Sequence, residues 1–232
     1  MQLFMKNSRR LGMAAGVILA SVAVLYLLLY MYERPGGWSD QRMSRSLGMD
    51  QTLQIPLGKS PEEAVRLFRA SDTMTVIHQE PAARGELVFL TRPGQQGSSN
   101  LQVEYVRKTW LGWKWVWGGG YGMGGGPESS AINYMCFPEL EHISTPFPMV
   151  IGDVLNPSIQ HITVEQKEAG TDTSEAKLIK VGSDRTIWFA FQPVTAGVPF
   201  EIEGFDEDGE VAASKIITDA RDSGAIPLGG SK

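Results

Sequence analysis

Hydrophobic and polar positions change their spacing along the chain, and the first arrangement is an unbroken apolar run. Residues 11–32 contain no charged side chain. A helix rises 1.5 Å per residue, so this run can cross the roughly 30 Å hydrocarbon layer of a bilayer with a small tilt. Tyr26, Tyr30 and Tyr32 cluster toward its far end, as aromatic residues do at a membrane interface. The pattern predicts a transmembrane helix over residues 11–32.

A cleaved signal peptide is the competing interpretation of this run. Cleavage normally follows small residues at the end of the apolar region, whereas this run ends in YMYERPGG. The small residues Ser21 and Ala23 would direct cleavage into the middle of the helix. We therefore expect an uncleaved signal anchor.

The charges around the run predict its orientation. Lys6, Arg9 and Arg10 precede it without an acidic neighbour. Cationic flanks stay in the cytoplasm, so residues 1–10 are expected to form a cytoplasmic basic tail, with the C-terminal part outside the cell. Removing those three cations leaves 18 Lys and Arg against 26 Asp and Glu for the exterior part. That balance argues against nucleic acid and anionic lipid headgroups as main partners.

A second arrangement follows a segment without periodicity. Residues 33–59 are rich in Gly, Ser and Pro, which is typical of a tether. A helix is predicted next, because Ser60 suits the N-cap, Pro61 suits the first helical position and Glu63 completes a capping box. Apolar or small residues then recur with helical spacing and predict one buried face: Ala64, Leu67, Phe68 and Ser71.

After this helix the apolar period changes to two. Four segments alternate or run apolar between turn-forming residues: 74–79, 86–91, 101–108 and 112–117. Residues 60–118 are therefore predicted to form a small α+β domain, with the helix laid across an antiparallel sheet. The order of elements resembles cystatin-like folds, which is a likeness of fold that carries no activity.

The second half of the chain has a third arrangement. Residues 131–218 contain about seven short strand-like runs separated by clusters of Gly, Pro, Asn and Asp. This spacing predicts a β-sandwich of immunoglobulin-like type. The glycine-rich residues 119–130 are expected to join the two domains, and residues 219–232 to form a flexible tail. The fold class is thus predicted as α+β and mostly β.

The stretch TWLGWKWVWGGGYGMGGGP, residues 109–127, holds four of the six tryptophans. In a strand, Trp113, Trp115 and Trp117 would project to one face. Their rings would expose several hundred Å² if nothing covered them, so we favour a core position beneath the predicted helix. Two alternatives stay open: a binding face for a partner or glycan, formed by these rings with Tyr121, and contact with the nearby membrane.

No motif predicts a cofactor, a metal or a catalytic site. Gly120, Gly122 and Gly125 match the spacing of a dinucleotide loop, but the sequence after them favours neither a helix nor a ribose-binding acid. The acidic run FDEDGE, residues 205–210, lacks the terminal acid of a calcium loop and is interpreted as a hairpin turn. The histidines are isolated, and Cys136 is expected to be a buried small hydrophobe.

The chain resembles uncharacterised single-pass envelope proteins of endospore-forming bacteria. The resemblance rests on a basic start, one span, and the segments GWKWVWGGG, EAKLIKV, DRTIWFAF and PFEIEGFDEDGE. It implies a topology and an organism type, and no activity. We therefore hypothesise a non-enzymatic, membrane-anchored extracytoplasmic protein that binds an envelope protein or wall component. The alternative is an envelope hydrolase whose acids lie far apart in sequence, such as Glu104 and Asp153.

Overall fold

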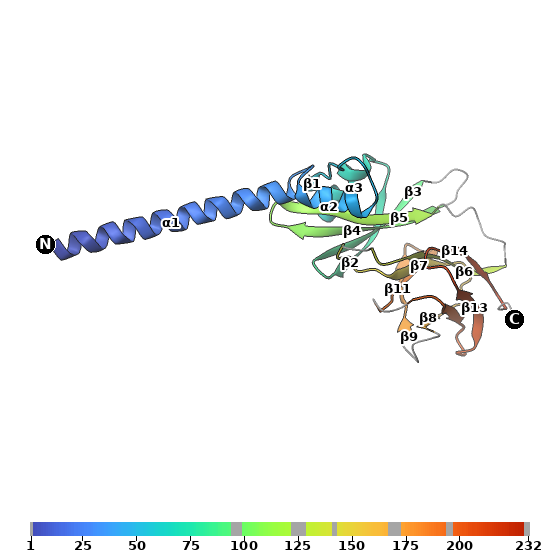
Figure 1. The fold of residues 1–232 in the computed structure, drawn as a ribbon. Coiled ribbons are helices and arrows are strands. Elements are labelled where there is room, and N and C mark those ends of the chain that lie inside the picture. Colours follow the sequence, from blue (N-terminus) through green and yellow to red (C-terminus); the bar gives the residue numbers. More distant parts are fainter. Residues whose placement is uncertain are drawn as a thin grey trace.

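The computed structural model of the chain describes residues 2–93, 99–121, 129–140, 143–166, 173–193 and 197–229; the side chains of residues 2–12, 93, 99 and 121 lie outside that description. A long helix projects from a folded body, in which short helices cover a stack of antiparallel sheets (Figure 1). The body is mostly β-structure, as the sequence predicts.

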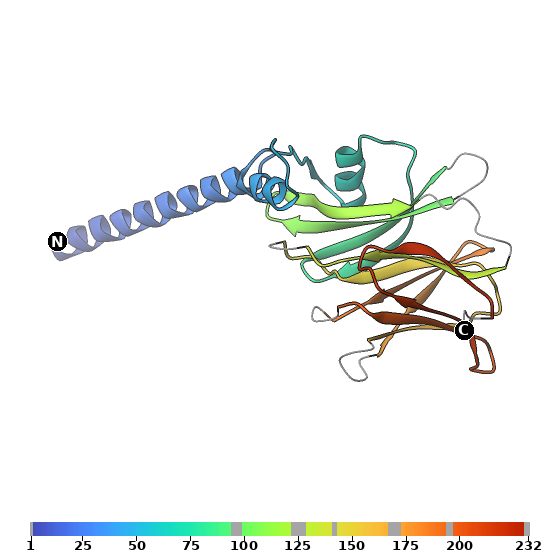
Figure 2. The ribbon, with the colours of Figure 1, turned by 45° about the vertical axis from the view of Figure 1, so that its right-hand side comes forward.

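Helix α1, Gln2–Glu33, contains the predicted span. By length and composition it can cross a membrane, and none of its most apolar stretch is buried. The helix begins well before residue 11, so the backbone of residues 2–10, predicted as a separate tail, continues it. Figures 1 and 2 show α1 leaving the body as a single helix without a neighbour.

The segment predicted as a tether is folded. It contains helix α2, Trp38–Ser46, and strand β1, Leu57–Gly58. The buried Asp40 carboxylate accepts hydrogen bonds from the backbone N–H groups of Gly36, at 2.8 Å, and Ile55, at 3.0 Å. These side-chain-to-backbone contacts fix the segment at both ends, and a search for hydrophobic periodicity does not register them.

Helix α3 and four strands follow in the order that the sequence predicts. The strands form an antiparallel meander, and β1 pairs with β5 at its edge, so the order is β1-β5-β4-β3-β2. We name this the first sheet. The bounds are α3 Pro61–Arg69, β2 Thr75–Ala82, β3 Gly85–Pro93, β4 Ser99–Thr109 and β5 Gly112–Tyr121.

The start of α3 follows its predicted cap, with one change of partner. Ser60 Oγ accepts a hydrogen bond from the N–H of Glu63 at 3.1 Å. The Glu63 carboxylate accepts the N–H of Lys59 at 2.5 Å, where a capping box would use that of Ser60. The N-terminal end of the helix is therefore fixed by the residues that the sequence indicates.

The buried face of α3 differs from the predicted one by one position. Ala64 and Val65 are buried, and Phe68 stacks on Trp115 of β5. Because the stripe facing the sheet runs through these residues, Leu67, predicted as buried, is exposed.

The remaining strands form two further antiparallel sheets. The second sheet has the order β10-β11-β7-β6-β14, and the third sheet has the order β13-β12-β8-β9. The bounds are β6 Ser130–Phe137, β7 Met149–Val154, β8 His161–Gln166, β9 Thr173–Glu175, β10 Lys177–Val181, β11 Arg185–Phe191, β12 Phe200–Phe205, β13 Val211–Ile217 and β14 Ser223–Pro227.

Two segments expected to be irregular contain strand. The backbone of Gly118, Gly119 and Gly120 belongs to β5, so the predicted glycine-rich joint begins as sheet, while residues 122–128 lie outside the described residues. Strand β14 comes from the predicted flexible tail and pairs with β6. Its one fully buried side chain, Ile226, is too little to give a periodic signal.

The three sheets are stacked, and the second sheet is covered on both sides (Figure 2). One core cluster joins it to the first sheet, where the rings of Phe89 and Phe189 lie 5.0 Å apart. The other core cluster joins it to the third sheet and includes Trp188 and Phe200. The neighbouring residues 188 and 189 therefore face different cores, as alternation along a strand requires. The two predicted domains share an apolar layer.

Candidate functional site

The structure separates the tryptophans that were predicted to share a face. Trp115 is 4% exposed, and its ring stacks on Phe68 at 3.7 Å, so the core interpretation is correct for this residue. A bulge in the β4–β5 pairing sets Trp115 opposite Val106 and Trp117 opposite Tyr105. Facing residues share a side of a sheet and consecutive residues alternate. Trp115 and Trp117 therefore lie on opposite sides.

The three rings consequently do not form one binding face. Trp113 and Trp117 are each half-buried and pack against the core cluster of the first sheet. The backbone of Tyr121 pairs with Leu101, and the Tyr121 side chain lies outside the described residues. Strict alternation predicted a shared face because it takes no account of a bulge, which adds one residue and reverses the side of every residue beyond it.

Trp115 belongs to a buried polar cluster around Glu104. The Glu104 carboxylate has no exposed surface and accepts hydrogen bonds from Arg69 at 2.8 and 3.0 Å, from Trp115 Nε1 at 2.6 Å and from the Gln102 amide. Gly118 is required beside it, since a Cβ atom there would lie 2.1 Å from Glu104 Oε2. Both carboxylate oxygens are thus paired with the same guanidinium, an arrangement that suits a structural ion pair.

The second acid of the hydrolase hypothesis, Asp153, does not join Glu104. Asp153 lies on β7 of the second sheet, and Arg185 Nε donates to its Oδ1 at 2.5 Å. Glu104 lies on β4, on the side of the first sheet that faces α3 and Arg69. Each acid is neutralised by its own arginine, and the first sheet separates the two.

Cys136 is buried between the second and third sheets. Burial raises the pKa of its thiol to about 12. Because the thiolate is the nucleophilic form of cysteine, this residue is inert at neutral pH. The prediction of a buried small hydrophobe is confirmed.

The acidic run before β13 is a hairpin turn, as predicted. Asp206 Oδ1 accepts the backbone N–H groups of Asp208 at 3.0 Å and Glu210 at 2.9 Å, and Gly209 has the positive φ of 80° that such a turn favours. Within the described part of the chain, no group of three or more His, Cys, Asp or Glu side chains is arranged to hold a metal ion.

The end of α1 is held by a cluster of charged groups. The Glu33 carboxylate accepts two hydrogen bonds from Arg107 of β4, both at 2.8 Å, and the Glu33 carbonyl accepts one from Lys114 Nζ at 2.7 Å. Lys114 also pairs with Asp40 of α2 at 2.6 Å, and both of those side chains are at most 2% exposed. Helices α1 and α2 are thereby joined to the first sheet at one point.

The charge states of this cluster depend on its burial and pairing. Burial lowers the pKa of Lys114, and the hydrogen bond to Asp40 offsets only part of that effect. Burial acts in the same direction on Arg107, but the hydrogen bonds and charge of Glu33 raise the pKa of that guanidinium above its ordinary value. The Arg107 guanidinium therefore remains charged throughout the physiological pH range.

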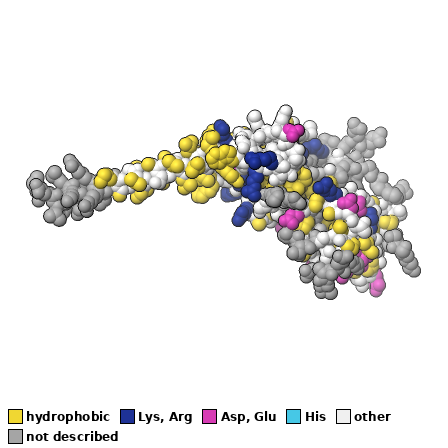
Figure 3. Space-filling view, viewed as in Figure 1, with side chains coloured by type: hydrophobic (Ala, Val, Ile, Leu, Met, Phe, Trp, Pro, Cys, Tyr) yellow, Lys and Arg dark blue, Asp and Glu magenta, His cyan; other side chains and the backbone are white. Residues whose placement is uncertain are grey.

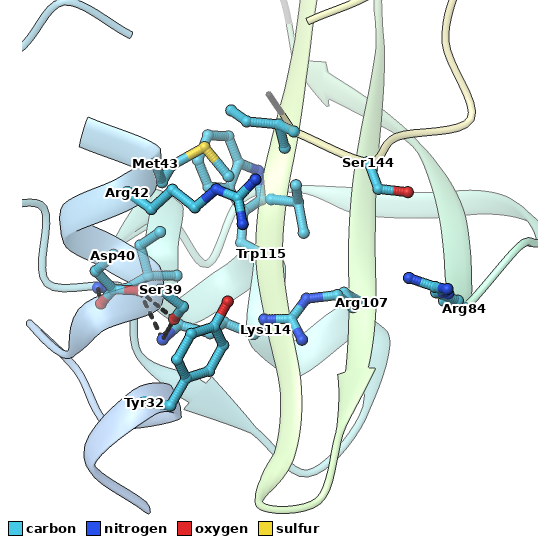
Figure 4. A pocket seen from close by; sticks show the side chains of 13 residues that line it. Tyr32, Ser39, Asp40, Arg42, Met43, Arg84, Arg107, Lys114, Trp115 and Ser144 are labelled. Atoms are coloured by element: carbon cyan, nitrogen blue, oxygen red, sulfur yellow. Dashed lines mark hydrogen bonds and ion pairs between the residues drawn. The ribbon is translucent and has the colours of Figure 1, made fainter. Parts of the chain in front are cut away.

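A cavity of about 350 Å³ lies beside this cluster (Figure 4). Its described lining contains four cations, Arg42, Arg84, Arg107 and Lys114, and one acid, Asp40. Arg42 and Arg84 are exposed, and among the described residues neither has a carboxylate within ion-pair distance. The described lining of the cavity therefore carries an excess of positive charge.

The cavity is built where the predicted span ends. Tyr32, one residue before the end of α1, contributes to its lining. In Figure 4, Arg42 extends toward the cavity from α2, Arg107 extends toward it from β4, and Arg84 stands beyond Arg107. A cavity lined by several guanidinium groups suits an anion with several oxygen atoms, such as a phosphate.

The turn between β4 and β5 exposes one large apolar side chain. Trp110 is 87% exposed, more than any other large hydrophobic residue in the described part of the chain. Thr109 Oγ1 accepts the N–H of Leu111 at 3.1 Å and donates to the Gly112 carbonyl at 2.9 Å, so the turn is held in one conformation. Figures 1 and 2 show this end of the first sheet beside the last turns of α1.

Charge is unevenly distributed between the two halves of the chain that follows the predicted span. Residues 33–121 contain eleven Lys and Arg against nine Asp and Glu, whereas residues 122–232 contain seven against seventeen. In Figure 3, Lys and Arg side chains gather on the body next to the end of α1. The acidic balance that argued against anionic lipids therefore belongs to the part of the chain that forms the second and third sheets.

No family model, no curated protein and no solved structure matches the chain.

Sequence patterns missed the charged cluster and the cavity. Arg107 and Glu33 are 74 residues apart, and such a pairing leaves no local periodic signal. One signal was present: Lys114 interrupts the apolar run WKWVW, and a lysine on the inner part of a sheet requires a counter-charge. A second was the group of arginines shortly after the span, which includes Arg34 and Arg42.

Proposed function

We propose that the chain is a single-pass membrane protein whose body is a non-enzymatic binding or structural module on the extracytoplasmic side of a bacterial cell envelope. The observation that carries the proposal is the docking of α1, since Glu33 at its end is bonded to Arg107 and Lys114 of the first sheet. A span joined in this way sets the orientation of the body on the membrane. A flexible tether would leave that orientation free.

The state of the acids and the thiol supports a binding or structural role over hydrolysis. Glu104 and Asp153 are each paired with an arginine and lie on different sheets. The thiol of Cys136 is buried and protonated at neutral pH. No observation on the described residues favours the hydrolase alternative.

The second and third sheets supply the surface for a partner. With the edge strand β14 left out, their orders are β10-β11-β7-β6 and β13-β12-β8-β9. This order supports an immunoglobulin-like sandwich, in which one sheet has the order ABED and the other contains C, F and G. The acidic excess of residues 122–232 suits a cationic envelope protein or wall component.

Topology can be tested with full-length protein that carries one epitope tag at each end. We expect it to resist alkaline extraction from membranes and to keep both tags on the mature chain. Protease added to intact spheroplasts should remove the C-terminal tag and leave the N-terminal tag. A C-terminal tag that is degraded only after lysis would contradict the orientation. Loss of the N-terminal tag from the mature protein would instead identify a cleaved signal peptide.

A further inference from the structure

The end of the first sheet beside α1 has an exposed aromatic side chain and a cationic cavity close together, which is rare on a protein surface that faces only water. It has a fully projecting tryptophan, Trp110, a cavity with unpaired arginines, and the end of a span in the same place. Nothing in the described part of the chain covers Trp110. A large exposed apolar group beside cations is a feature of surfaces that bind a partner or a membrane.

The level of this end relative to the bilayer follows from one contact. Arg107 is bonded to Glu33, one residue past the predicted span, and Trp110 lies three residues beyond Arg107 along β4 and its turn. A strand rises about 3.3 Å per residue, so the Trp110 backbone lies roughly 10 Å from the Arg107 backbone. In Figures 1 and 2 this displacement runs back along α1, toward its N-terminus. The turn between β4 and β5, which carries Trp110, therefore lies beside the last turns of α1.

We propose that this end of the first sheet docks on the bilayer that α1 crosses, with Trp110 inserted among the lipid headgroups and the phosphate of an anionic phospholipid bound in the cavity by Arg42, Arg84 and Arg107. We name it the headgroup site. It rests on the proposed membrane anchoring of α1. We choose a lipid as the occupant because Tyr32, the last residue of the predicted span, lines the cavity, and lipid phosphates lie where a span leaves the hydrocarbon layer.

Both the tryptophan and the arginines of the headgroup site suit a phospholipid. A tryptophan has an apolar body and one N–H group, and it is enriched at membrane interfaces for that reason. Guanidinium groups bind phosphate oxygens in pairs and stay charged at all physiological pH values. Arg42 and Arg84 are exposed and without a carboxylate partner among the described residues. They can therefore bind a lipid phosphate without breaking an ion pair between described residues.

The charge distribution favours the same arrangement over the whole body. Residues 33–121, next to α1, have a small excess of cations, eleven against nine acids, whereas residues 122–232 have seven cations against seventeen acids. An anionic surface attracts the first and repels the second. The body is thus held with its basic end down and its acidic sheets directed away from the lipid.

The insertion of Trp110 can be measured by fluorescence. Full-length protein is placed in nanodiscs whose phospholipids carry bromine near the headgroup end of the acyl chain, and in matched discs without bromine. We expect wild-type protein to lose more tryptophan emission to bromine than Trp110→Phe does. Equal fractional quenching of the two proteins would overturn the insertion of Trp110.

The anionic lipid can be tested by native mass spectrometry of the full chain released from detergent. Phosphatidylglycerol and phosphatidylcholine with the same acyl chains are titrated separately, and glycerol phosphate is added as a soluble competitor. We expect wild-type protein to retain phosphatidylglycerol preferentially. Each cation near an anionic surface contributes a factor of about five, so Arg42→Gln with Arg84→Gln should weaken retention about 25-fold. The matched control, Lys180→Gln with Arg221→Gln, removes two cations of the remote part and should leave retention unchanged.

The outcomes separate the site from the anchoring on which it rests. Equal retention of the two lipids, or equal loss in the test and control variants, would overturn the headgroup site while α1 still anchors the chain. Displacement of phosphatidylglycerol by glycerol phosphate at equal concentration would overturn the lipid as the occupant. A full-length chain that is extracted from membranes by alkali would instead overturn the proposed function.

Discussion

At the scale of single residues, burial decides the role of each charged side chain. Glu104 has the same spacing as an outward-facing residue of an alternating strand, yet its carboxylate is fully buried and bonded to Arg69 and Trp115. Glu62 has its partner Arg66 one helical turn away, and both of those side chains are nearly half exposed. The sequence alone does not show that Glu104 is buried and Glu62 exposed, because it does not show which element packs over the strand.

Replacing Glu104 by Gln should be strongly destabilising. It removes the charge opposite Arg69, whose side chain is 26% exposed, and breaking a buried ion pair on one side costs about 3 kcal/mol or more. Chemical unfolding of the full-length protein in nanodiscs measures the loss. The control, Glu62→Gln, removes the charge from the exposed pair and should cost less than about 1 kcal/mol. Equal losses in the two variants would show that Glu104 is not held as described.

Cys136 should be unreactive in the folded protein. Its pKa of about 12 leaves almost no thiolate at pH 8, and the residue is buried. A thiol reagent should modify it only after urea is added, whereas Ser158→Cys, a variant at an exposed position, should react at once. The raised pKa also means that the folded state holds this proton more tightly, so its contribution to stability is lost as pH rises from about 9 to about 12. Rapid labelling of native Cys136 would contradict its position.

At the scale of elements, local patterns identified most strands and missed the segments fixed by polar contacts. Alternating or continuous apolar runs between turn-forming residues predicted β2 to β5, and turn clusters separated the strands of the second half. Helix α2 was missed because Asp40 and Ser44, rather than an apolar stripe, tie it to the body. The prediction that Trp113, Trp115 and Trp117 share one face was wrong for a different reason, because one bulge reversed the alternation of sides along β5.

Replacing Asp40 by Asn should detach α2 and loosen α1. The change leaves Lys114 buried without its counter-charge, at a cost of about 3–5 kcal/mol. Trypsin added to the full-length protein in nanodiscs should then cut faster after Arg42 and Arg45. Asp72→Asn, at an exposed position outside the cluster, should leave cleavage and stability unchanged within about 0.5 kcal/mol. Unchanged cleavage of Asp40→Asn would mean that the ion pair does not hold α2.

At the scale of the whole molecule, the second sheet joins the two predicted domains. Phe189 faces the first sheet and Trp188 faces the third. Disrupting the core on one side of the second sheet is therefore expected to affect the core on its other side. Lys177 of β10 adds a salt bridge to Glu80 of β2 at 2.7 Å. Sequence patterns could identify two groups of strands but not their stacking, because both faces of a central sheet are apolar and no local signal says what covers each.

Replacing Phe189 by Ala should therefore destabilise the body as one unit. A buried phenylalanine truncated to alanine costs about 3–5 kcal/mol, and Phe189 is 2% exposed. Calorimetry of the full-length protein should show one transition that moves to lower temperature without splitting. Phe191→Ala on the same strand removes a ring that is 38% exposed and should shift it much less. Two separated transitions would show that the halves fold independently.

The central claim is that α1 is docked on the body and not tethered to it. Amide hydrogen exchange of residues 34–46, measured on the full-length protein in nanodiscs, tests this claim most directly. Docking through Glu33, Asp40 and Lys114 predicts slow exchange for α2, comparable to that of β4 and β5. Complete exchange of residues 34–46 at the shortest labelling time, with β4 and β5 still protected, would contradict the account.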